Sequence, residues 1–125
     1  MARILIAEDE EALSALCARA LAIEGHEVDT ASDGGHALEI LTRESGAFDL
    51  LLTDIRMPVM DGIALALSAA RDFPDLTILL MTGYADQRER AHGLDAIIHD
   101  VIAKPFTVAD LRATVAEALK VRRRN

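Results

Sequence analysis

The stretch FDLLLTDIRMPVMDG, which runs from Phe48 to Gly62, decides how this chain is interpreted. It begins with an apolar run, reaches the carboxylate of Asp54, and continues into a turn that contains Pro58. That order indicates a buried strand that brings an acidic side chain to the rim of a sheet, where ligands bind in open α/β folds. Taken alone, an acid after a strand is more often a turn former or a helix cap, so its meaning depends on the rest of the chain.

Five short apolar runs, including this one, indicate buried strands. Their nearly continuous apolar character, rather than alternation, is typical of parallel strands that are covered on both faces. The second run is the most polar and is predicted to be an edge strand. The five predicted strands are Arg3–Ala7, Glu27–Ala31, Asp49–Thr53, Thr77–Met81 and Val101–Ala103.

Helical patterns lie between the predicted strands. The first helix is expected to end before Gly25, the second near Gly46, and the third before Pro74. Thr107 and Asp110 resemble a capping box at the start of the last helix, with Asp in place of the usual Glu or Gln. The expected inward faces are Leu13, Leu16, Cys17, Ala20 and Leu21; Ala37, Leu38 and Leu41; Ile63, Ala66, Leu67 and Ala70; and Val108, Leu111, Val115, Ala118 and Leu119.

The segment between the last two strands is ambiguous. Residues 86–92 are polar, Gly93 interrupts the pattern, and residues 94–98 are apolar again. Either one helix with a weak point or a short helix followed by an apolar loop fits this pattern. Five βα units in 125 residues predict one α/β domain, a doubly wound parallel sheet with right-handed crossovers and helices on both faces.

Composition bounds the class of protein and its location. A chain that is 51% hydrophobic and has no low-complexity segment is typical of a globular protein. No apolar run approaches the ~20 residues that span a bilayer, and the N-terminus lacks the pattern of a secretion signal. The single Cys17 permits no internal disulfide and fits a reducing cytosol. We therefore expect a cytoplasmic protein with no membrane contact.

The formal net charge is −8, although four of the 13 basic residues lie in the last six positions. The rest of the chain is therefore more acidic than the net charge indicates. Such a domain repels nucleic acid, and direct binding to nucleic acid is not expected. We predict a domain over residues 1–121 and a short basic tail over residues 122–125. The tail is interpreted as a solvated end that complements the C-terminal helix dipole rather than as a contact for an acidic partner.

Polar side chains follow four of the predicted strands. Glu8 and Asp9 come after the first strand, Asp54 after the third, Thr82 after the fourth and Lys104 after the fifth. The carboxyl ends of parallel strands share one rim, so these groups are expected to converge. Three carboxylates would repel one another without a cation, and oxygen-only ligands suit Mg²⁺. Carboxylate, Mg²⁺, lysine and hydroxyl together form a phosphoryl-handling set in which Asp itself can be the nucleophile.

Each of these residues alone has an ordinary explanation. Glu8 and Asp9 fit the acidic first turn of a helix, and Thr82 fits a turn. Lys104 is less ordinary, because it is one of two lysines and lies between an apolar strand and Pro105. The prediction therefore rests on the combination of polar groups at four strand ends.

Four motifs, at residues 4–10, 54–62, 81–83 and 104–106, together resemble the receiver domain of two-component response regulators, the CheY-like family. The resemblance covers nearly the whole chain. It implies a flavodoxin-like (βα)5 fold, with a five-stranded parallel sheet in the order 2-1-3-4-5. Within the family, the chain is similar to single-domain regulators of the CpdR type, which act as phosphorylation-controlled adaptors for proteolysis.

The resemblance also implies a phosphoacceptor and a Mg²⁺ site. Asp54 would accept a phosphoryl group from a histidine kinase or a histidine phosphotransfer protein. Asp9 would bind Mg²⁺ directly and Glu8 through water. Asp54 and the backbone carbonyl of Arg56 would be further ligands.

Further roles follow from the same resemblance. Thr82 would hydrogen-bond the phosphoryl group and move on activation, and Lys104 would pair with a phosphoryl oxygen. Gly83 would modulate the site, Pro105 would follow a cis peptide bond, and Gly62 would supply a turn conformation closed to other residues.

The resemblance implies a switch rather than an enzyme that acts on an external substrate. The protein would assist its own phosphorylation and dephosphorylation. The added charge would change the surface formed by the fourth helix, the fifth strand and the fifth helix, to which a downstream protein binds. A monomer or a weak dimer is expected.

Three positions and one short segment tune or depart from the family pattern. Val101 stands where receivers carry Tyr or Phe, and residues 97–100 replace a common Gly-Ala pair. Either the fourth helix is reshaped or loosened, or the substitution is structural and leaves switching intact. Arg56 and Tyr84 each lie two residues after a site residue, and we predict that their bulk lengthens the lifetime of the phosphoryl group by screening water.

Three readings of the whole chain remain open at this point. The first is a stand-alone receiver, which begins directly at its first strand and has no output domain. The second is a piece of a longer regulator, with Arg122–Arg124 as the stub of a linker. The third is a Mg²⁺-dependent phosphatase that forms an aspartyl-phosphate. Such enzymes usually carry a second Asp two residues after the nucleophile, where this chain has Arg56.

Overall fold

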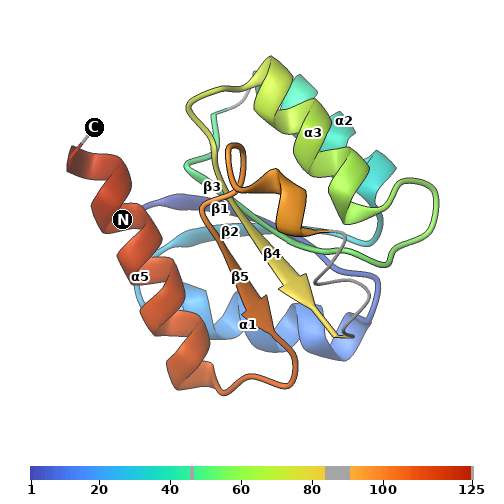
Figure 1. The fold of residues 1–125 in the computed structure, drawn as a ribbon. Helices are drawn as coiled ribbons and strands as arrows, with labels where there is room; N and C mark the ends of the chain where they lie inside the picture. The colour runs from blue at the N-terminus through green and yellow to red at the C-terminus, as the bar shows by residue number, and fades with distance from the viewer. Residues whose placement is uncertain (46, 84–90, 125) are drawn as a thin grey trace.

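In the computed structural model of the chain, the described residues are 1–45, 47–83 and 91–124. They form a five-stranded, wholly parallel sheet in the order β2-β1-β3-β4-β5 (Figure 1). The predicted fold class and strand order are therefore confirmed. The strands are β1 (Arg3–Ala7), β2 (Glu27–Ala31), β3 (Leu50–Asp54), β4 (Thr77–Thr82) and β5 (Asp100–Ala103).

Strand boundaries agree with the sequence to within one residue at each end. The polar β2 lies at an edge of the sheet, as predicted. Strands β3 and β4 each extend one residue further than predicted, so Asp54 and Thr82 are the last residues of their strands. Both residues belong to the parallel ladder, which fixes their backbones more firmly than a loop would.

Helices cover both faces of the sheet (Figure 1). One face packs against α1 and α5, and the other packs against α2 and α3, which lie side by side. The described helices are α1 (Glu11–Ile23), α2 (Gly34–Arg43), α3 (Gly62–Asp72) and α5 (Val108–Arg124). None of the helices in the described ranges is long and apolar enough to cross a membrane.

The inward faces of α1 and α3 differ from the prediction. Leu16 and Leu67 were expected to face inward, but they are 50% and 51% exposed. Both helices carry apolar residues around most of their circumference, so the period of 3.6 residues does not specify a single face. The side that is buried is made by Ser14, Cys17, Ala20 and Leu21 in α1, and by Gly62, Leu65, Ala66 and Ala69 in α3.

The start of α5 is the capping box that the sequence indicates. The Asp110 backbone N–H donates to Thr107 Oγ1 at 3.0 Å, and the Thr107 N–H donates to Asp110 Oδ2 at 3.2 Å. The helix then continues through Arg124 and therefore includes most of the basic segment. The boundary between a domain and a basic tail stays a prediction.

The ambiguous segment before β5 lies partly outside the described residues, which exclude residues 84–90. From His92 onward it forms a 3-10 turn, η1 (His92–Leu94), and a further turn rather than an α-helix. The apolar residues 94–98 therefore follow the second of the two expectations, an apolar loop. Leu94, Ile97 and Val101 are partly buried against the core on the α2–α3 side of the sheet.

Candidate functional site

The register of the sheet brings the predicted site residues together. Ala7 pairs with Thr53, so the residues that follow them, Glu8 and Asp54, lie beside each other. On the other side, Thr82 pairs with Ala103, and the Thr82 carbonyl accepts the backbone N–H of the next residue, Lys104, at 2.7 Å. Because all five strands are parallel, these positions share the carboxyl-terminal rim.

Lys104 connects two buried carboxylates. Its Nζ lies 2.8 Å from Glu8 Oε1 and 3.2 Å from Asp54 Oδ2. The Glu8 side chain is 1% exposed and that of Asp54 is 10% exposed, whereas that of Lys104 is 22% exposed. One ammonium therefore serves as the shared counterion of two carboxylates that lie largely out of water.

Backbone donors fix the remaining oxygens of the same carboxylates. Asp54 Oδ1 accepts the Ile55 N–H at 2.9 Å, and Glu8 Oε2 accepts the Glu10 N–H at 3.0 Å. Sequence reasoning missed Ile55 and Glu10, because a backbone N–H is present at nearly every position and leaves no signature. Each carboxylate is thus held at both oxygens, with one directed toward Lys104.

Burial has different consequences for the pKa values of the two partners in the Glu8–Lys104 ion pair. Burial raises the pKa of the Glu8 carboxyl, and the hydrogen bonds from Glu10 and Lys104 offset this only in part. Burial alone would lower the pKa of Lys104, but its hydrogen bond to Glu8 and the charge of Asp54 outweigh burial and leave that pKa raised. Lys104 is therefore protonated at neutral pH and places a positive charge beside the two carboxylates.

A cavity of about 250 Å³ opens over these groups. Its lining is made by Glu8, Asp9, Glu10, Asp54, Arg56, Gly83 and Lys104. Within the described part of the chain, Thr82 is the one predicted acceptor-site residue that does not line this cavity; it is 2% exposed. Tyr84, a predicted modulator, lies outside the described residues.

The carboxylates of Glu8, Asp9 and Asp54 could together hold a metal ion, because each offers an oxygen within 4.8 Å of the others. Oxygens bound to one Mg²⁺ lie at most about 4.2 Å apart, because each Mg–O distance is about 2.1 Å. The set fits Mg²⁺ after a movement of about half an ångström, or with one carboxylate bound through water. Glu8 is the natural candidate for the water-mediated position, since Lys104 and the Glu10 N–H already hold its oxygens.

The loop after β3 requires a correction. Gly62 was expected to adopt a turn conformation closed to other residues, but among the described glycines only Gly25 has a positive φ, of 92°. Gly62 instead begins α3, and a Cβ there would overlap the backbone carbonyl of Asp54. Glycine is needed here for close approach, not for backbone freedom. The predicted cis peptide bond between Lys104 and Pro105 is present.

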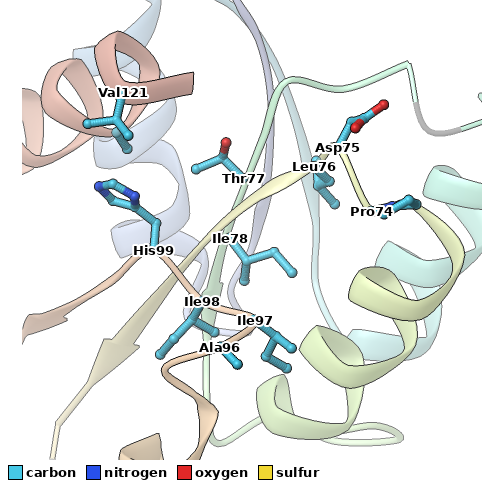
Figure 2. Close-up of a pocket in the computed structure, with 11 residues that line it drawn as sticks. Pro74, Asp75, Leu76, Thr77, Ile78, Ala96, Ile97, Ile98, His99 and Val121 are labelled. Carbon is cyan, nitrogen blue, oxygen red and sulfur yellow. The ribbon is translucent and has the colours of Figure 1, made fainter. Parts of the chain in front are cut away.

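A larger hollow, of about 640 Å³, lies elsewhere in the molecule (Figure 2). It lies beside the amino-terminal part of β4, where Thr77, Ile98, His99 and Val121 contribute to its lining. No residue of the carboxylate cluster lines it. The chemistry of the described residues therefore points to the smaller cavity.

Comparison with known proteins agrees with this fold. The family model of the response regulator receiver domain matches residues 4–116. This chain belongs to that family, the receiver domains of two-component signalling. The transcriptional regulatory protein TcrA of Mycobacterium tuberculosis is 37% identical over 111 residues, which are 89% of this chain and 43% of TcrA. The chain spans about half the length of the curated relatives that it matches.

Solved structures of receiver domains are similar over nearly the whole chain. A CheY-like receiver domain protein from Methanospirillum hungatei has a TM-score of 0.90 and 31% identity, and the match covers 99% of this chain and 98% of that protein. The response regulator TrrA from Thermotoga maritima, solved in complex with Mg²⁺ and BeF, has a TM-score of 0.82 and 31% identity. The match covers 94% of this chain and 99% of TrrA.

Proposed function

We propose that this receiver domain accepts a phosphoryl group on Asp54, from a histidine kinase or a histidine phosphotransfer protein, in a Mg²⁺-dependent reaction. The observation that carries the proposal is the shared Lys104 ammonium between Glu8 and Asp54, beside the exposed Asp9. Such a cluster would supply a nucleophilic carboxylate, a fixed cation and a set of metal ligands around one cavity. The family and the Mg²⁺-BeF complex of TrrA support the same reading.

In the proposed reaction, an Asp54 carboxylate oxygen attacks the phosphorus of the donor phosphohistidine. The new P–O bond forms as the P–N bond breaks, and the electron pair remains on the imidazole nitrogen of the donor. Lys104 would follow the developing phosphoryl charge, since its Nζ already lies 3.2 Å from Asp54 Oδ2. The Thr82 hydroxyl would move into the cavity to donate a hydrogen bond.

Glu8, Asp9 and Asp54, with the backbone carbonyl of Arg56, would hold the Mg²⁺. The ion would neutralise charge on the transferring phosphoryl group. The Arg56 side chain is exposed and lines the cavity, where it would screen the aspartyl-phosphate from water. We expect the phosphoryl group to decay faster in Arg56→Asn combined with Tyr84→Glu than in wild type; equal or slower decay would contradict the screening role.

The same geometry favours a switch over an enzyme that turns over external substrates. Arg56 lies two residues after Asp54, where an aspartyl-phosphate phosphatase usually carries a second carboxylate as its acid and base. We therefore expect no steady-state hydrolysis of an external phosphomonoester. The output would pass to a downstream protein through the surface formed by the segment before β5, by β5 and by α5. The longer relatives make an output domain on the same chain the alternative route.

The decisive experiment is transfer of labelled phosphate from acetyl phosphate. We expect acid-stable, alkali-labile label on wild type with Mg²⁺, little label after chelation of the metal, and no label on Asp54→Asn. Asp49→Asn is a matched control, because Asp49 lies at the opposite end of β3 and is outside the cavity. Label retained by Asp54→Asn would overturn the assignment of the phosphoacceptor.

A further inference from the structure

The larger hollow, of about 640 Å³, lies where β4 extends past the start of its neighbour β5. Strand β4 begins at Thr77, whereas its pairing with β5 begins two residues later, at Leu79 and Asp100. Just before that point, the His99 N–H donates to the Ile78 carbonyl at 2.7 Å. The hollow lies beside the first residues of β4 (Figure 2). Its lining includes residues 97–99, part of the segment that departs from the family pattern, and the proposed phosphoryl chemistry uses none of them.

The apolar part of the lining comes from both faces of the sheet. Ile78, Ile97 and Ile98 belong to the core on the α2–α3 side, and Ala118 belongs to the core on the α1–α5 side. Ile97 and Val121 are only partly buried, so both leave apolar surface exposed beside the hollow. A volume of this size lies within the range of small-molecule pockets, roughly 300–1,000 Å³. A ligand with an apolar body would remove this surface from water.

The polar side chains of the lining can all accept hydrogen bonds. Thr77, His99 and Val121 lie toward one end of the hollow, and Asp75 lies toward the other (Figure 2). His99 Nε2 lies 2.7 Å from Glu117 Oε2. An ionised carboxylate can only accept, so Nε2 carries the proton of that bond, and Nδ1 of the neutral ring is an acceptor. The Thr77 hydroxyl is a second group that can accept at the same end.

The charges around the hollow favour a cation. Among the described residues that line it, Asp75 is the one with a fixed charge, and Glu117 adds a second negative charge behind the His99 ring. An ammonium group donates three hydrogen bonds and is attracted by both carboxylates. An anionic ligand would instead be repelled by them and by the chain as a whole, whose formal net charge is −8.

We propose that this hollow binds a small organic amine. Its ammonium group would donate to His99 and Thr77, and its apolar body would lie against Ile97 and Val121. The site would give the domain a second input, at the end of the sheet opposite Asp54. It does not depend on the proposed phosphoacceptor, because no residue of the carboxylate cluster lines the hollow.

The test is an NMR titration of the isotope-labelled chain with three probes that share one apolar body. Phenethylamine carries an ammonium group, phenethyl alcohol a neutral hydroxyl and phenylacetate a carboxylate. We expect phenethylamine to bind with a Kd of about 1–10 mM, as is usual for so small a ligand. Phenethyl alcohol should bind about fivefold more weakly, and phenylacetate at least about tenfold more weakly. The backbone signals of Ile78, Ile97 and His99 should shift, whereas those of Glu8 and Asp54 should not.

Three variants test which groups recognise the amine. Glu117→Gln keeps an acceptor for His99 Nε2 but removes the charge, so the preference for the amine over the alcohol should fall from about fivefold to about twofold. Thr77→Val keeps the shape of the side chain and removes the hydroxyl, so both probes should bind about threefold more weakly. Glu39→Gln is the matched control, because Glu39 is exposed on α2 and does not line the hollow; its binding should equal that of wild type.

Several results would overturn the amine site. They are equal binding of the amine and the alcohol, tighter binding of phenylacetate, shifts that avoid the lining residues, or an unchanged preference for the amine in Glu117→Gln. Asp54→Asn should bind phenethylamine as wild type does, and a loss of binding there would contradict a separate site. Failure of Asp54 to accept phosphate would refute the proposed function and leave this result unaffected.

Discussion

Lys104→Met should raise the affinity of the site for Mg²⁺. The Lys104 ammonium is the counterion of Glu8 and Asp54, with Nζ–oxygen distances of 2.8 Å and 3.2 Å. An ion bound to Asp54 Oδ2 at about 2.1 Å would lie within about 5.3 Å of Nζ if the lysine stayed in place. Metal and lysine therefore repel each other, and they compete for the same oxygens.

The repulsion can be estimated from these distances. Charges of +2 and +1 separated by about 5.3 Å repel by about 1.6 kcal/mol even at the dielectric constant of bulk water. Because a factor of ten corresponds to about 1.4 kcal/mol, removal of the ammonium should tighten Mg²⁺ binding by about tenfold. Partial burial would increase the repulsion, whereas movement of the lysine would relieve part of it.

Isothermal titration calorimetry is the suitable assay, because the chain has no tryptophan to report binding by fluorescence. Lys120→Met is the matched control, since Lys120 is the other lysine of the chain and is exposed on α5. Lys104→Arg keeps the charge and should bind Mg²⁺ nearly as wild type does. Circular dichroism would verify that each variant is folded. Equal or weaker Mg²⁺ binding by folded Lys104→Met would refute the reasoning.

Other predictions concern stability. Burial raises the pKa of the Cys17 thiol to about 11 from its usual 9.0, so the stability it contributes is complete below pH 9 and is lost as the pH rises through about 11. Chemical denaturation of Cys17→Ala should therefore show a shallower alkaline loss than wild type, and parallel profiles would contradict this. Gly62→Ala should lower the free energy of unfolding by about 1–3 kcal/mol, because its Cβ meets the end of β3. Gly93→Ala should change it by less than about 0.5 kcal/mol, because that Cβ meets nothing within 4 Å; similar losses would argue against the overlap. Thr107→Ala should lower the free energy of unfolding by about 1 kcal/mol, because α5 loses the hydroxyl that caps its first turn. Thr107→Ser keeps a hydroxyl there and should retain most of that stability. Val59→Asn should raise the free energy of unfolding, measured by thermal denaturation, by about 1 kcal/mol, because asparagine tolerates the left-handed backbone better than valine does. A lower free energy of unfolding would show that the left-handed backbone is not strained there.

The sheet could be predicted from sequence because its strands are buried on both faces. Residues 50–54 are buried throughout, and so is nearly all of β4. Such strands form continuous apolar runs whose limits are sharp. Helix faces could be predicted less well, because α1 and α3 carry alanine and leucine on several sides. Their orientation is fixed by close contacts, such as that of Gly62 with the Asp54 carbonyl, which no periodicity reveals.

The candidate site could be predicted because polar side chains follow several parallel strands, whose carboxyl ends share one rim of the sheet. Glu8, Asp54 and Lys104 were identified from the sequence and form one ion-pair cluster. The supporting backbone donors could not be found in this way, nor could the left-handed conformation of Val59, which contradicts the local preference of its residue type. Conflicts of this kind between residue and backbone are expected where function constrains a loop.

Formal charges explain why a metal and a lysine would both be needed. Three carboxylates and the Lys104 ammonium leave the cluster at a formal charge of about −2, which Mg²⁺ would bring to about zero. Phosphorylation replaces the Asp54 carboxylate by an acyl phosphate of about −2, so the site would gain about one further negative charge. With the metal bound, that excess negative charge would stay small, and Lys104 could leave Glu8 to contact the phosphoryl group. Without Mg²⁺, the excess negative charge of the phosphorylated cluster would be about threefold larger, in a partly buried cavity. The proposed Mg²⁺ dependence would thus follow from the charge of the cluster, independently of the identity of the phosphodonor.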